Sequence, residues 1–550
     1  MVTDQLTELV TKALESAAAD GVVEGPWAVT LERPKRRDHG DWSTNVALTL
    51  RGRGGKPRDV AEALVERLPP SETVERVEVA GPGFLNFYLS PRWLHEVVRR
   101  AADESTAFAR TDEGKGARVN VEYVSANPTG PAGVVAGRAA AVGDTIANLL
   151  EATGHEVTRE YYINDAGRQM TLFARSVEAH YLNHLGVGAS VPEEGYKGDY
   201  VRELAREIAE ELGDELVARP EEERLQRLGS LALGRMIEAI RASLERFGTR
   251  FDNWFSEREM NERGAVEAAI ERLRSAGWLE EREGAVWFRA SALGDDKDRV
   301  LVRRDGRPTY LASDAAYMLD KFDRSFDRLI YVLGPDHHGT LARMRALADA
   351  LGFGRARVEL PIVQKMTILS GGSTLKASKR AGVVIALDDL VREVGRDAAR
   401  YTFLIRSLDA PLEFDIETVK QQTPENPVFY TQYAHARICS ILRRAEAEGN
   451  MSGAGVAQLE RLEHPSEDRL MRKLAAYEEV VPLAAQLRAP QRIPRYVEEL
   501  AADFNAFYRD CRVVSDDTDL TSARLMLCVG TRRVIADALA LLGVDAPQRM

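Results

Sequence analysis

Cysteine is scarce in this sequence, and long apolar runs are missing. Only three cysteines occur among 550 residues, and they stand far apart, at Cys439, Cys511 and Cys528. This spacing supports neither a disulfide framework nor a zinc site, so we expect reduced thiols in the core and no metal. No apolar stretch approaches the ~18 residues that would span a bilayer, and the first residues lack the basic and apolar segments of a secretory signal. We therefore expect a cytoplasmic protein that does not enter a membrane.

An excess of basic residues is missing as well. The chain has 74 lysines and arginines against 86 aspartates and glutamates, which gives a net charge of -12. This argues against a general nucleic-acid binder, because phosphate contacts need concentrated lysine and arginine. Residues 190–230 hold 12 acidic and 6 basic side chains, so this segment carries half of the net charge. The rest of the surface is closer to neutral and has room for local basic patches.

The chain is too long for one compact core, and its first part has mixed patterns. Apolar residues recur with helical spacing from Leu6 to Leu14, whereas residues 77–89 alternate around a Gly-Pro-Gly turn, which predicts a hairpin. We interpret residues 1–110 as a small α+β module. Residues 32–42 form a basic turn, and a nucleic-acid contact and a solvated loop explain it equally well.

Two strand, loop and helix units follow. Residues 118–124 alternate like a strand and lead through a Pro/Gly-rich turn into a helical pattern that reaches Leu150. Residues 329–333 lead in the same way into a helical pattern over residues 341–351. Such units are typical of a Rossmann-type nucleotide-binding domain. The acidic segment between them has one apolar helical stripe, which predicts an inserted helical element, and the sequence after Ala398 is patterned as a helical bundle.

Two separated stretches carry a family resemblance. Residues 122–131 read Glu-Tyr-Val-Ser-Ala-Asn-Pro-Thr-Gly-Pro, and residues 376–382 read Lys-Ala-Ser-Lys-Arg-Ala-Gly. They resemble the two signature regions of class I aminoacyl-tRNA synthetases of the arginyl type. Further matching stretches are residues 161–167, 294–298, 425–428 and 541–544. The resemblance implies a multidomain α/β protein with a small α+β amino-terminal domain that contacts tRNA (1–110), a Rossmann-type class I catalytic domain (115–397) with a helical insertion at about 175–260, and an all-α, anticodon-binding carboxyl-terminal bundle (398–550).

The first signature departs from the family pattern. Members carry a His-x-Gly-His motif, whose imidazoles stabilise the charge on the phosphates of ATP at a helix amino terminus. Here the corresponding residues are Gly133, Val134, Val135 and Ala136, and the following Gly-Arg pair sets the register. Both histidines and the motif glycine are therefore absent. The alternative interpretation is a tolerated variant whose donors come from elsewhere.

The second signature keeps its charged residues. By resemblance, Lys376 and Lys379 place ammonium groups against the triphosphate, and Ser378 binds a phosphate oxygen. ATP with Mg²⁺ is then a substrate, and no tightly bound cofactor is implied. Without the family context, a short loop of lysine and serine would be weak support for any function.

The resemblance also predicts an arginine pocket and two tRNA-binding surfaces. Glu122 and Asn127 would hold the α-amino end of arginine, while Tyr310, Asp314 and His337 would face its guanidinium. Adjacent histidines at positions 337 and 338 point in different directions, so we do not interpret them as a metal site. The candidate tRNA contacts are Arg33, Lys35, Arg36 and Arg37 in the first domain and Tyr430, Tyr433, Arg437, Arg443 and Arg444 in the last.

The implied function is arginine–tRNA ligation. Arginine and ATP would give arginyl adenylate and pyrophosphate, and the 3′-terminal ribose of tRNA(Arg) would then attack the acyl group. Because of the altered first signature, we expect impaired activation. Two alternatives stay open: a non-catalytic paralogue that binds arginine or tRNA, and an altered enzyme with a specialised role. The family implies a monomer.

Overall fold

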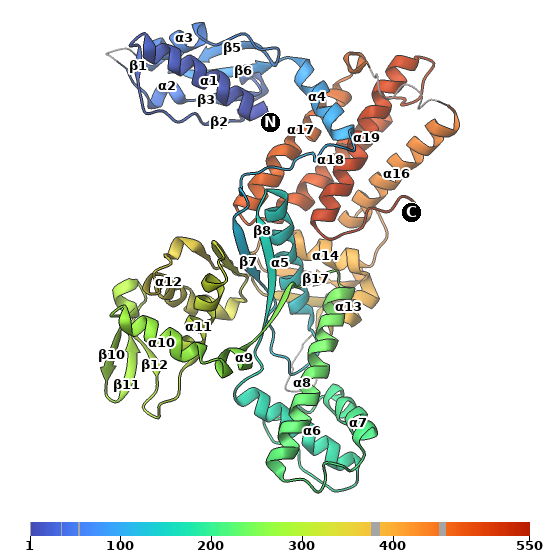
Figure 1. The fold of residues 1–550 in the computed structure, drawn as a ribbon. Helices are drawn as coiled ribbons and strands as arrows, with labels where there is room; N and C mark the ends of the chain where they lie inside the picture. The colour runs from blue at the N-terminus through green and yellow to red at the C-terminus, as the bar shows by residue number, and fades with distance from the viewer. Residues whose placement is uncertain (1, 35, 53–55, 376–384, 450–457) are drawn as a thin grey trace. The chain divides into compact units, whose positions relative to one another are not determined.

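The computed structural model describes residues 2–34, 36–52, 56–375, 385–449 and 458–550 (Figure 1). The chain divides into two compact units. The first comprises residues 1–108, 438–478 and 502–534, and the second comprises residues 109–437, 479–501 and 535–550. Among the described residues, no helix combines the length and the apolar character needed to cross a membrane.

The first unit begins with an antiparallel sheet packed against helices. Its strands lie in the order β2-β3-β6-β5. The predicted hairpin is confirmed, since β5 and β6 pair antiparallel around the Gly-Pro-Gly turn. Gly83 has a φ of 143°, and a Cβ there would lie 2.8 Å from the Pro57 carbonyl oxygen, so only glycine fits this turn. The elements are α1 (Val2–Ala19), β1 (Val23–Glu24), β2 (Leu31–Glu32), β3 (Trp42–Thr44), α2 (Val46–Thr49), β4 (Arg51–Gly52), α3 (Pro57–Glu66), β5 (Val74–Ala80), β6 (Phe84–Leu89) and α4 (Pro91–Ala102).

The carboxyl-terminal part of the chain is helical, as the sequence predicts. Its long helices are α16 (Pro427–Ala447), α17 (Pro465–Gln486), α18 (Arg492–Asp510) and α19 (Thr518–Leu541), and they contribute residues to both units. Cys439, Cys511 and Cys528 are all buried and none of the three is in a disulfide, so the expectation of reduced core thiols is confirmed.

A parallel sheet forms the centre of the second unit. Its strands lie in the order β14-β13-β7-β8-β9, and every neighbouring pair is parallel. Helix α5 follows β7 and leads to β8 on one side, whereas β13 pairs with the other side of β7. The strand order therefore reverses at β7, and ligands of such sheets bind beyond the carboxyl ends of the strands at this point. The elements are β7 (Arg118–Glu122), α5 (Val134–Ala152), β8 (Glu156–Ile163), β9 (Asn253–Ser256), α11 (Tyr310–Asp323), β13 (Arg328–Tyr331), α12 (Leu341–Ala350) and β14 (Val358–Glu359).

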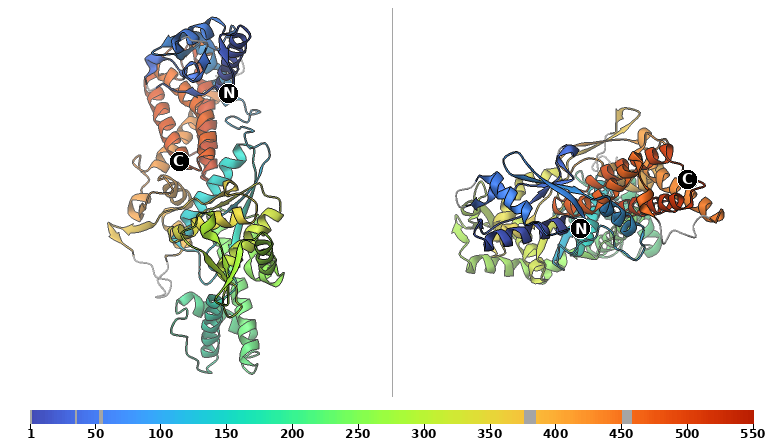
Figure 2. Two further views of the ribbon diagram at one scale, coloured as in Figure 1. Left: turned by 90° about the vertical axis from the view of Figure 1, so that its left-hand side faces the viewer. Right: turned by 90° about the horizontal axis from the view of Figure 1, so that it is seen from above.

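The acidic segment lies in a group of three helices inserted between β8 and β9. These are α6 (Arg168–His184), α7 (Asp199–Leu212) and α8 (Glu221–Arg246). Figure 1 shows α6 and α7 away from the parallel sheet, whereas α8 runs back towards it, and the left view of Figure 2 shows the same group from the side. Val201, Leu204 and Ile208 are buried on α7, so the predicted apolar stripe is the face that packs.

Smaller elements surround the sheet. A hydrophobic core joins α10 and α12 to α11 and contains Met260, Leu311 and Leu347. The two further three-stranded sheets have the orders β10-β11-β12 and β16-β15-β17. The remaining elements of the unit are α9 (Glu257–Glu262), α10 (Ala265–Ser275), β10 (Leu279–Arg282), β11 (Ala285–Phe288), β12 (Arg299–Val302), β15 (Met366–Ser370), β16 (Ser373–Thr374), α13 (Leu387–Val394), α14 (Arg396–Leu404), β17 (Leu412–Asp415) and α15 (Ile416–Val419).

Candidate functional site

A cavity of about 560 Å³ opens beyond the carboxyl ends of β7, β8 and β13, where the strand order reverses. All five residues that the sequence predicts for an arginine pocket line it, namely Glu122, Asn127, Tyr310, Asp314 and His337. Residues that are as much as 215 positions apart in the chain therefore share one cavity.

Four pieces of local structure position the five side chains. Glu122 ends β7, and Asn127 lies in the loop that follows. Tyr310 begins α11, and Asp314 follows one turn later, on the same face, as the spacing predicts. His337 lies in the short 3-10 helix Pro335–Thr340 after β13. Tyr310 is 72% exposed, so its ring stands at the mouth of the cavity rather than at its floor.

The cavity is rich in carboxylates. Burial raises the pKa of Asp314 to about 7; the Arg343 guanidinium opposes this shift, and the negative charges of Glu122 and Glu257 add to it. The cavity is thus lined by three carboxylates and one guanidinium. A cation that pairs with these carboxylates would relieve their mutual repulsion. The charge pattern therefore suits a cationic ligand.

Glu257 is a cavity residue that the sequence analysis missed. It is the first residue of α9 and directly follows β9, so the parallel pairing of β9 with β8 brings it to the carboxyl edge of the sheet. Its side chain is buried and is hydrogen-bonded to Tyr162 and Ser313. Burial raises the pKa of Glu257, and the charge of Asp165 raises it further. A lone glutamate after a four-residue strand gives little signal in a sequence.

Lys321, which lies behind Glu122, is a second residue that the sequence analysis missed. The Glu122 carboxylate accepts a hydrogen bond from the Lys321 ammonium at 2.7 Å and another from the Ser125 hydroxyl at 3.0 Å. Lys321 has no exposed surface. The sequence does carry a signal for it, because Asp314, Tyr317 and Lys321 follow the i, i+3, i+7 spacing of one helix face.

The altered first signature forms the amino terminus of α5. Gly133 is the residue before the helix, and no side chain caps it. Val135 is 67% exposed, and the positions that would carry imidazoles are Gly133 and Ala136. A helix amino terminus attracts phosphate through its backbone N–H groups and its dipole. This end of the site thus keeps the backbone contribution, but the side chains of the motif add no donor.

The chain that follows the second signature returns to this same helix end. The Val134 N–H donates to the Ile385 carbonyl at 3.1 Å, and the Leu387 N–H donates to the Ala132 carbonyl at 2.8 Å. The two signature regions are therefore joined through backbone hydrogen bonds at residues 385–387. Lys376, Ser378 and Lys379 lie outside the described residues.

The basic turn of the first unit has partners of its own. The Arg33 guanidinium lies 4.6 Å from the Trp42 ring centre, and Arg36 pairs with Asp38 at 2.7 Å. Arg37 begins the 3-10 helix Arg37–His39, and Lys35 lies outside the described residues. Arg33 and Arg36 are exposed, so they are available to a ligand only in exchange for these contacts.

The other candidate tRNA residues all lie on α16. Tyr433 is 39% exposed, and the Arg437 guanidinium lies 4.6 Å from its ring centre. Tyr430 and Arg443 are half-buried, whereas Arg444 is exposed and pairs with Glu448 at 2.8 Å. The Tyr433 and Arg437 pair offers a flat ring next to a cation, which is a combination that suits stacking with a base.

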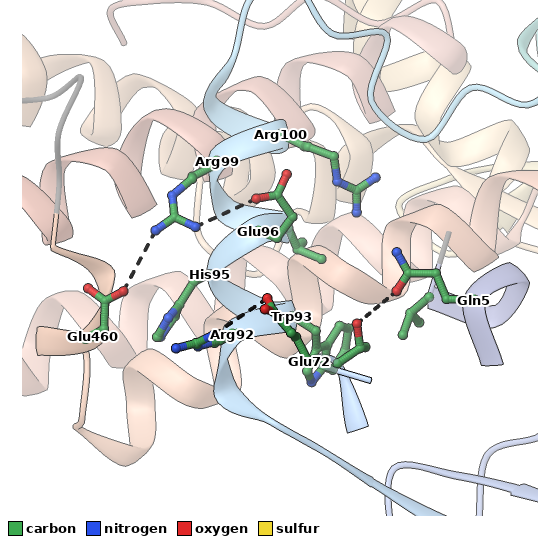
Figure 3. A pocket seen from close by; sticks show the side chains of 12 residues that line it. Gln5, Glu72, Arg92, Trp93, His95, Glu96, Arg99, Arg100 and Glu460 are labelled. Atoms are coloured by element: carbon green, nitrogen blue, oxygen red, sulfur yellow. Dashed lines mark hydrogen bonds and ion pairs between the residues drawn. The ribbon is translucent and has the colours of Figure 1, made fainter. Parts of the chain in front are cut away.

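Another cavity of about 560 Å³ lies in the first unit, beside α4 (Figure 3). Three arginines line it, but each has an acidic partner. Arg92 pairs with Glu72 at 3.6 Å, and Arg99 lies between Glu96 at 3.7 Å and Glu460 at 3.9 Å. The charges in this cavity are balanced, and none of the residues singled out in the sequence lines it. The cavity at β7 is therefore the better candidate site.

Comparisons with known proteins identify the family of the chain. Residues 103–407 match the family model for the catalytic domain of class I tRNA synthetases (R), residues 4–89 match the arginyl tRNA synthetase N-terminal domain, and residues 431–550 match the DALR anticodon binding domain. The arginine–tRNA ligase of Heliobacterium modesticaldum is 44% identical over 99% of this chain and 98% of its own length. That of Frankia alni is 45% identical over the whole of both chains.

Solved structures give the same result for the fold. A putative arginyl-tRNA synthetase from Campylobacter jejuni has a TM-score of 0.77 at 34% identity and covers 84% of this chain and 100% of its own. The arginyl-tRNA synthetase of Thermus thermophilus has a TM-score of 0.78 at 24% identity, with both chains covered completely. The fold prediction is confirmed, with a Rossmann-type catalytic core, a small α+β amino-terminal domain and a helical carboxyl-terminal part. The chain belongs to the arginyl-tRNA synthetase family, whose members are class I aminoacyl-tRNA ligases.

Proposed function

We propose that this chain binds arginine in the carboxylate-lined cavity, activates it with ATP and transfers it to tRNA(Arg), and that activation is weakened at the ATP end of the site. The observation that carries the proposal is the contrast between the two ends. Glu122, Glu257 and Asp314 line the cavity, whereas Gly133 and Ala136 stand where the family has imidazoles.

The arginine end has the chemistry that its ligand needs. Carboxylates bind a guanidinium through paired, charge-assisted hydrogen bonds. Asp314 and Glu257 lie on adjoining elements, α11 and α9, and serve the guanidinium together with Tyr310 and His337. Glu122 and Asn127 lie at the end of β7 and in the loop after it, nearer to α5, and bind the α-amino end. This arrangement directs the carboxyl group of arginine towards the amino terminus of α5, where ATP binds.

The ATP end relies on fewer groups. ATP enters as its Mg²⁺ complex, and Lys376, Ser378 and Lys379 bind its phosphates from the second signature. The amino terminus of α5 contributes backbone donors. Loss of one preorganised side-chain donor raises a barrier by roughly 3 to 4 kcal/mol, which is a factor of ~10²–10³ in rate, and two losses in one motif need not add. Adenylation is therefore the slow step.

Binding of tRNA uses both ends of the chain. The exposed arginines of the basic turn contact the tRNA elbow, and the rings and guanidinium groups of α16 contact the anticodon arm. We expect the protein to act as a monomer, with all site residues supplied by one chain.

Restoration of the motif tests the proposal directly. The triple variant Gly133→His, Val135→Gly, Ala136→His should gain at least ~10²-fold in arginine-dependent exchange of pyrophosphate into ATP, measured with tRNA(Arg) present. The unaltered chain should exchange slowly but above a control without enzyme. An unchanged or lower rate in the triple variant would mean that the altered motif does not limit activation.

A second candidate function is binding without turnover, and the exposed Val135 at the helix end favours it. Calorimetry with arginine and with tRNA(Arg) separates the two. Binding of either ligand with no exchange above the control would replace ligase activity with a sensing or sequestering role. If neither arginine nor tRNA(Arg) binds, both candidate functions are rejected.

A further inference from the structure

One lysine of the second unit is completely buried beside the cavity. Lys321 lies in the last turn of α11 and has no exposed surface. An ammonium group is costly to bury unless opposite charges and hydrogen bonds compensate for its lost hydration. The neighbours of Lys321 therefore indicate what the buried charge is for.

Two carboxylates and two aromatic rings surround the ammonium. Its nitrogen lies 2.7 Å from Glu122 Oε2 and 3.7 Å from Glu160 Oε1. It also lies 4.2 Å from the Tyr317 ring centre and 3.9 Å from the Tyr331 ring centre. The rings shield the group from water and attract its charge through their π faces. The short contact goes to Glu122, the carboxylate that lines the cavity.

Glu160 has other donors, so Lys321 is not needed to satisfy it. The Glu160 carboxylate accepts from the Tyr317 hydroxyl at 2.7 Å, from the Asn253 amide at 2.6 Å and from the Arg324 guanidinium at 2.6 and 3.0 Å. Burial disfavours its charge, but the positive charges of Lys321 and Arg324 outweigh this effect and lower the pKa of Glu160 to about 2. A purely structural partner of Glu160 would duplicate what Arg324 already provides.

The second oxygen of Glu122 is held by a strained turn. Val124 and Ser125 have φ values of 70° and 39°, which lie in the left-handed region that residues other than glycine rarely adopt. Such strain persists only where the surroundings enforce it, and it concentrates at functional sites. Here the turn lets the Ser125 hydroxyl donate to Glu122 Oε1 at 3.0 Å and accept from the Tyr162 N–H at 3.2 Å.

We propose that Lys321 and Ser125 are positioning residues that fix both oxygens of Glu122, so that the carboxylate accepts hydrogen bonds from the α-ammonium group of the bound amino acid. This inference rests on the proposed function, because it takes arginine as the ligand of the cavity. A carboxylate has about four acceptor positions. Lys321 and Ser125 occupy one on each oxygen, and the others are left for the ligand.

The proposal separates two ligands that differ in one group. L-Arginine carries the α-ammonium, whereas 5-guanidinopentanoic acid has the same chain, guanidinium and carboxylate without it. Calorimetry on the full chain should show that Lys321→Met lowers the affinity for L-arginine about 10- to 100-fold, the range expected for loss of a charged hydrogen-bond partner. It should change the affinity for 5-guanidinopentanoic acid by less than about twofold. Ser125→Ala, which removes only a hydroxyl group, should show the same selectivity with a smaller effect of about 3- to 10-fold.

A second buried cation serves as the matched control. Arg400 has no exposed surface and pairs with Asp144, and neither residue lines the cavity. Arg400→Met should lower the melting temperature without changing the ratio of the two affinities. In a chain that already carries Glu122→Gln, Lys321→Met should lower the affinity for arginine by no more than about twofold further, because the effects of substitutions at coupled residues are not additive.

The outcomes are distinct. An equal loss for both ligands in Lys321→Met and Ser125→Ala would assign these residues a structural role only and overturn the inference. Equal affinity of the unaltered chain for both ligands would also overturn it, while leaving arginine binding intact. If the unaltered chain binds neither ligand, the proposed function fails and the inference fails with it.

Discussion

The side-chain amide of Asn127 donates a hydrogen bond to the side-chain oxygen of Gln169 at 2.8 Å. Asn127 lies in the loop after β7, whereas Gln169 lies in the first turn of α6, the helix that opens the insertion. With its NH₂ group engaged, Asn127 presents its carbonyl oxygen to an incoming ammonium group. The inserted helices thereby influence the orientation of a residue in the cavity.

Removal of this partner should weaken arginine binding. Gln169→Leu frees the Asn127 amide to rotate, and the cost of reordering it should lower the affinity by about 3- to 10-fold, as expected for one hydrogen bond. Calorimetry measures the effect. Gln226 is an exposed glutamine on α8, and Gln226→Leu should leave the affinity unchanged; a loss of the same size there would point to general damage to the insertion.

The affinity for arginine should depend on pH. Loss of hydration in the cavity raises the pKa of Asp314 to about 7, and the carboxyl must be ionised to pair with a guanidinium. Below pH 7 the carboxyl is mostly protonated, so each further pH unit should lower the affinity about tenfold, whereas the affinity should level off above about pH 8. Titrations at pH 7 in buffers of different ionisation enthalpy should show release of about half a proton. A flat profile between pH 6 and 8 would contradict a role for Asp314 in binding.

Two helical glycines should respond to alanine in opposite directions. A Cβ on Gly143 of α5 would lie 2.5 Å from the Cβ of Tyr123, which is completely buried, whereas a Cβ on Gly234 of α8 would meet nothing within 4 Å. Gly143→Ala should therefore destabilise the protein by about 1 to 3 kcal/mol through overpacking. Gly234→Ala should stabilise it by about 0.5 to 1 kcal/mol because alanine favours a helix. Thermal melts of the two variants beside the parent chain give the comparison.

The buried ion pair between Arg400 and Asp144 should be important for stability. Arg400 also donates to the Leu542 carbonyl at 3.0 Å and to the Thr249 hydroxyl at 3.0 Å. Arg400→Met leaves Asp144 buried without this partner and should cost about 3 to 5 kcal/mol. The exposed pair of Arg206 with Glu210 on α7 is the control, and Arg206→Met should cost less than about 1 kcal/mol. Similar losses in both variants would show that burial does not decide the effect.

The sequence predicts the larger architecture because the relevant patterns are local. Alternating residues identify β7, and a continuous apolar run identifies β13, each before a turn that contains glycine and proline. The four-residue spacing of Tyr310 and Asp314 places them on one face of α11. The strand order of the sheet is a different matter. β7 pairs with β8 and with β13, where each residue of β13 lies opposite one that is 209 positions earlier in the chain. Nothing in the local pattern of either strand specifies its neighbours.

The residues of the candidate site fall into the same two groups, those that local patterns identify and those that only tertiary pairing brings together. Those in the signature stretch, such as Glu122 and Asn127, can be found from the sequence. Glu257 and Lys321 depend on tertiary pairing, since the partner of Lys321 is 199 positions away. A buried lysine and an exposed lysine look alike in a sequence unless the apolar positions around them are taken into account.

The position of the insertion has a consequence for the engineering of this protein. The helices α6, α7 and α8 leave the sheet after β8 and return at β9, directly before Glu257. Their outer ends can therefore be shortened or exchanged, provided that the new segment returns the chain to β9 in the same register. A graft that shifts this return by one residue would turn Glu257 away from the cavity, so ligand affinity reports on the quality of the graft.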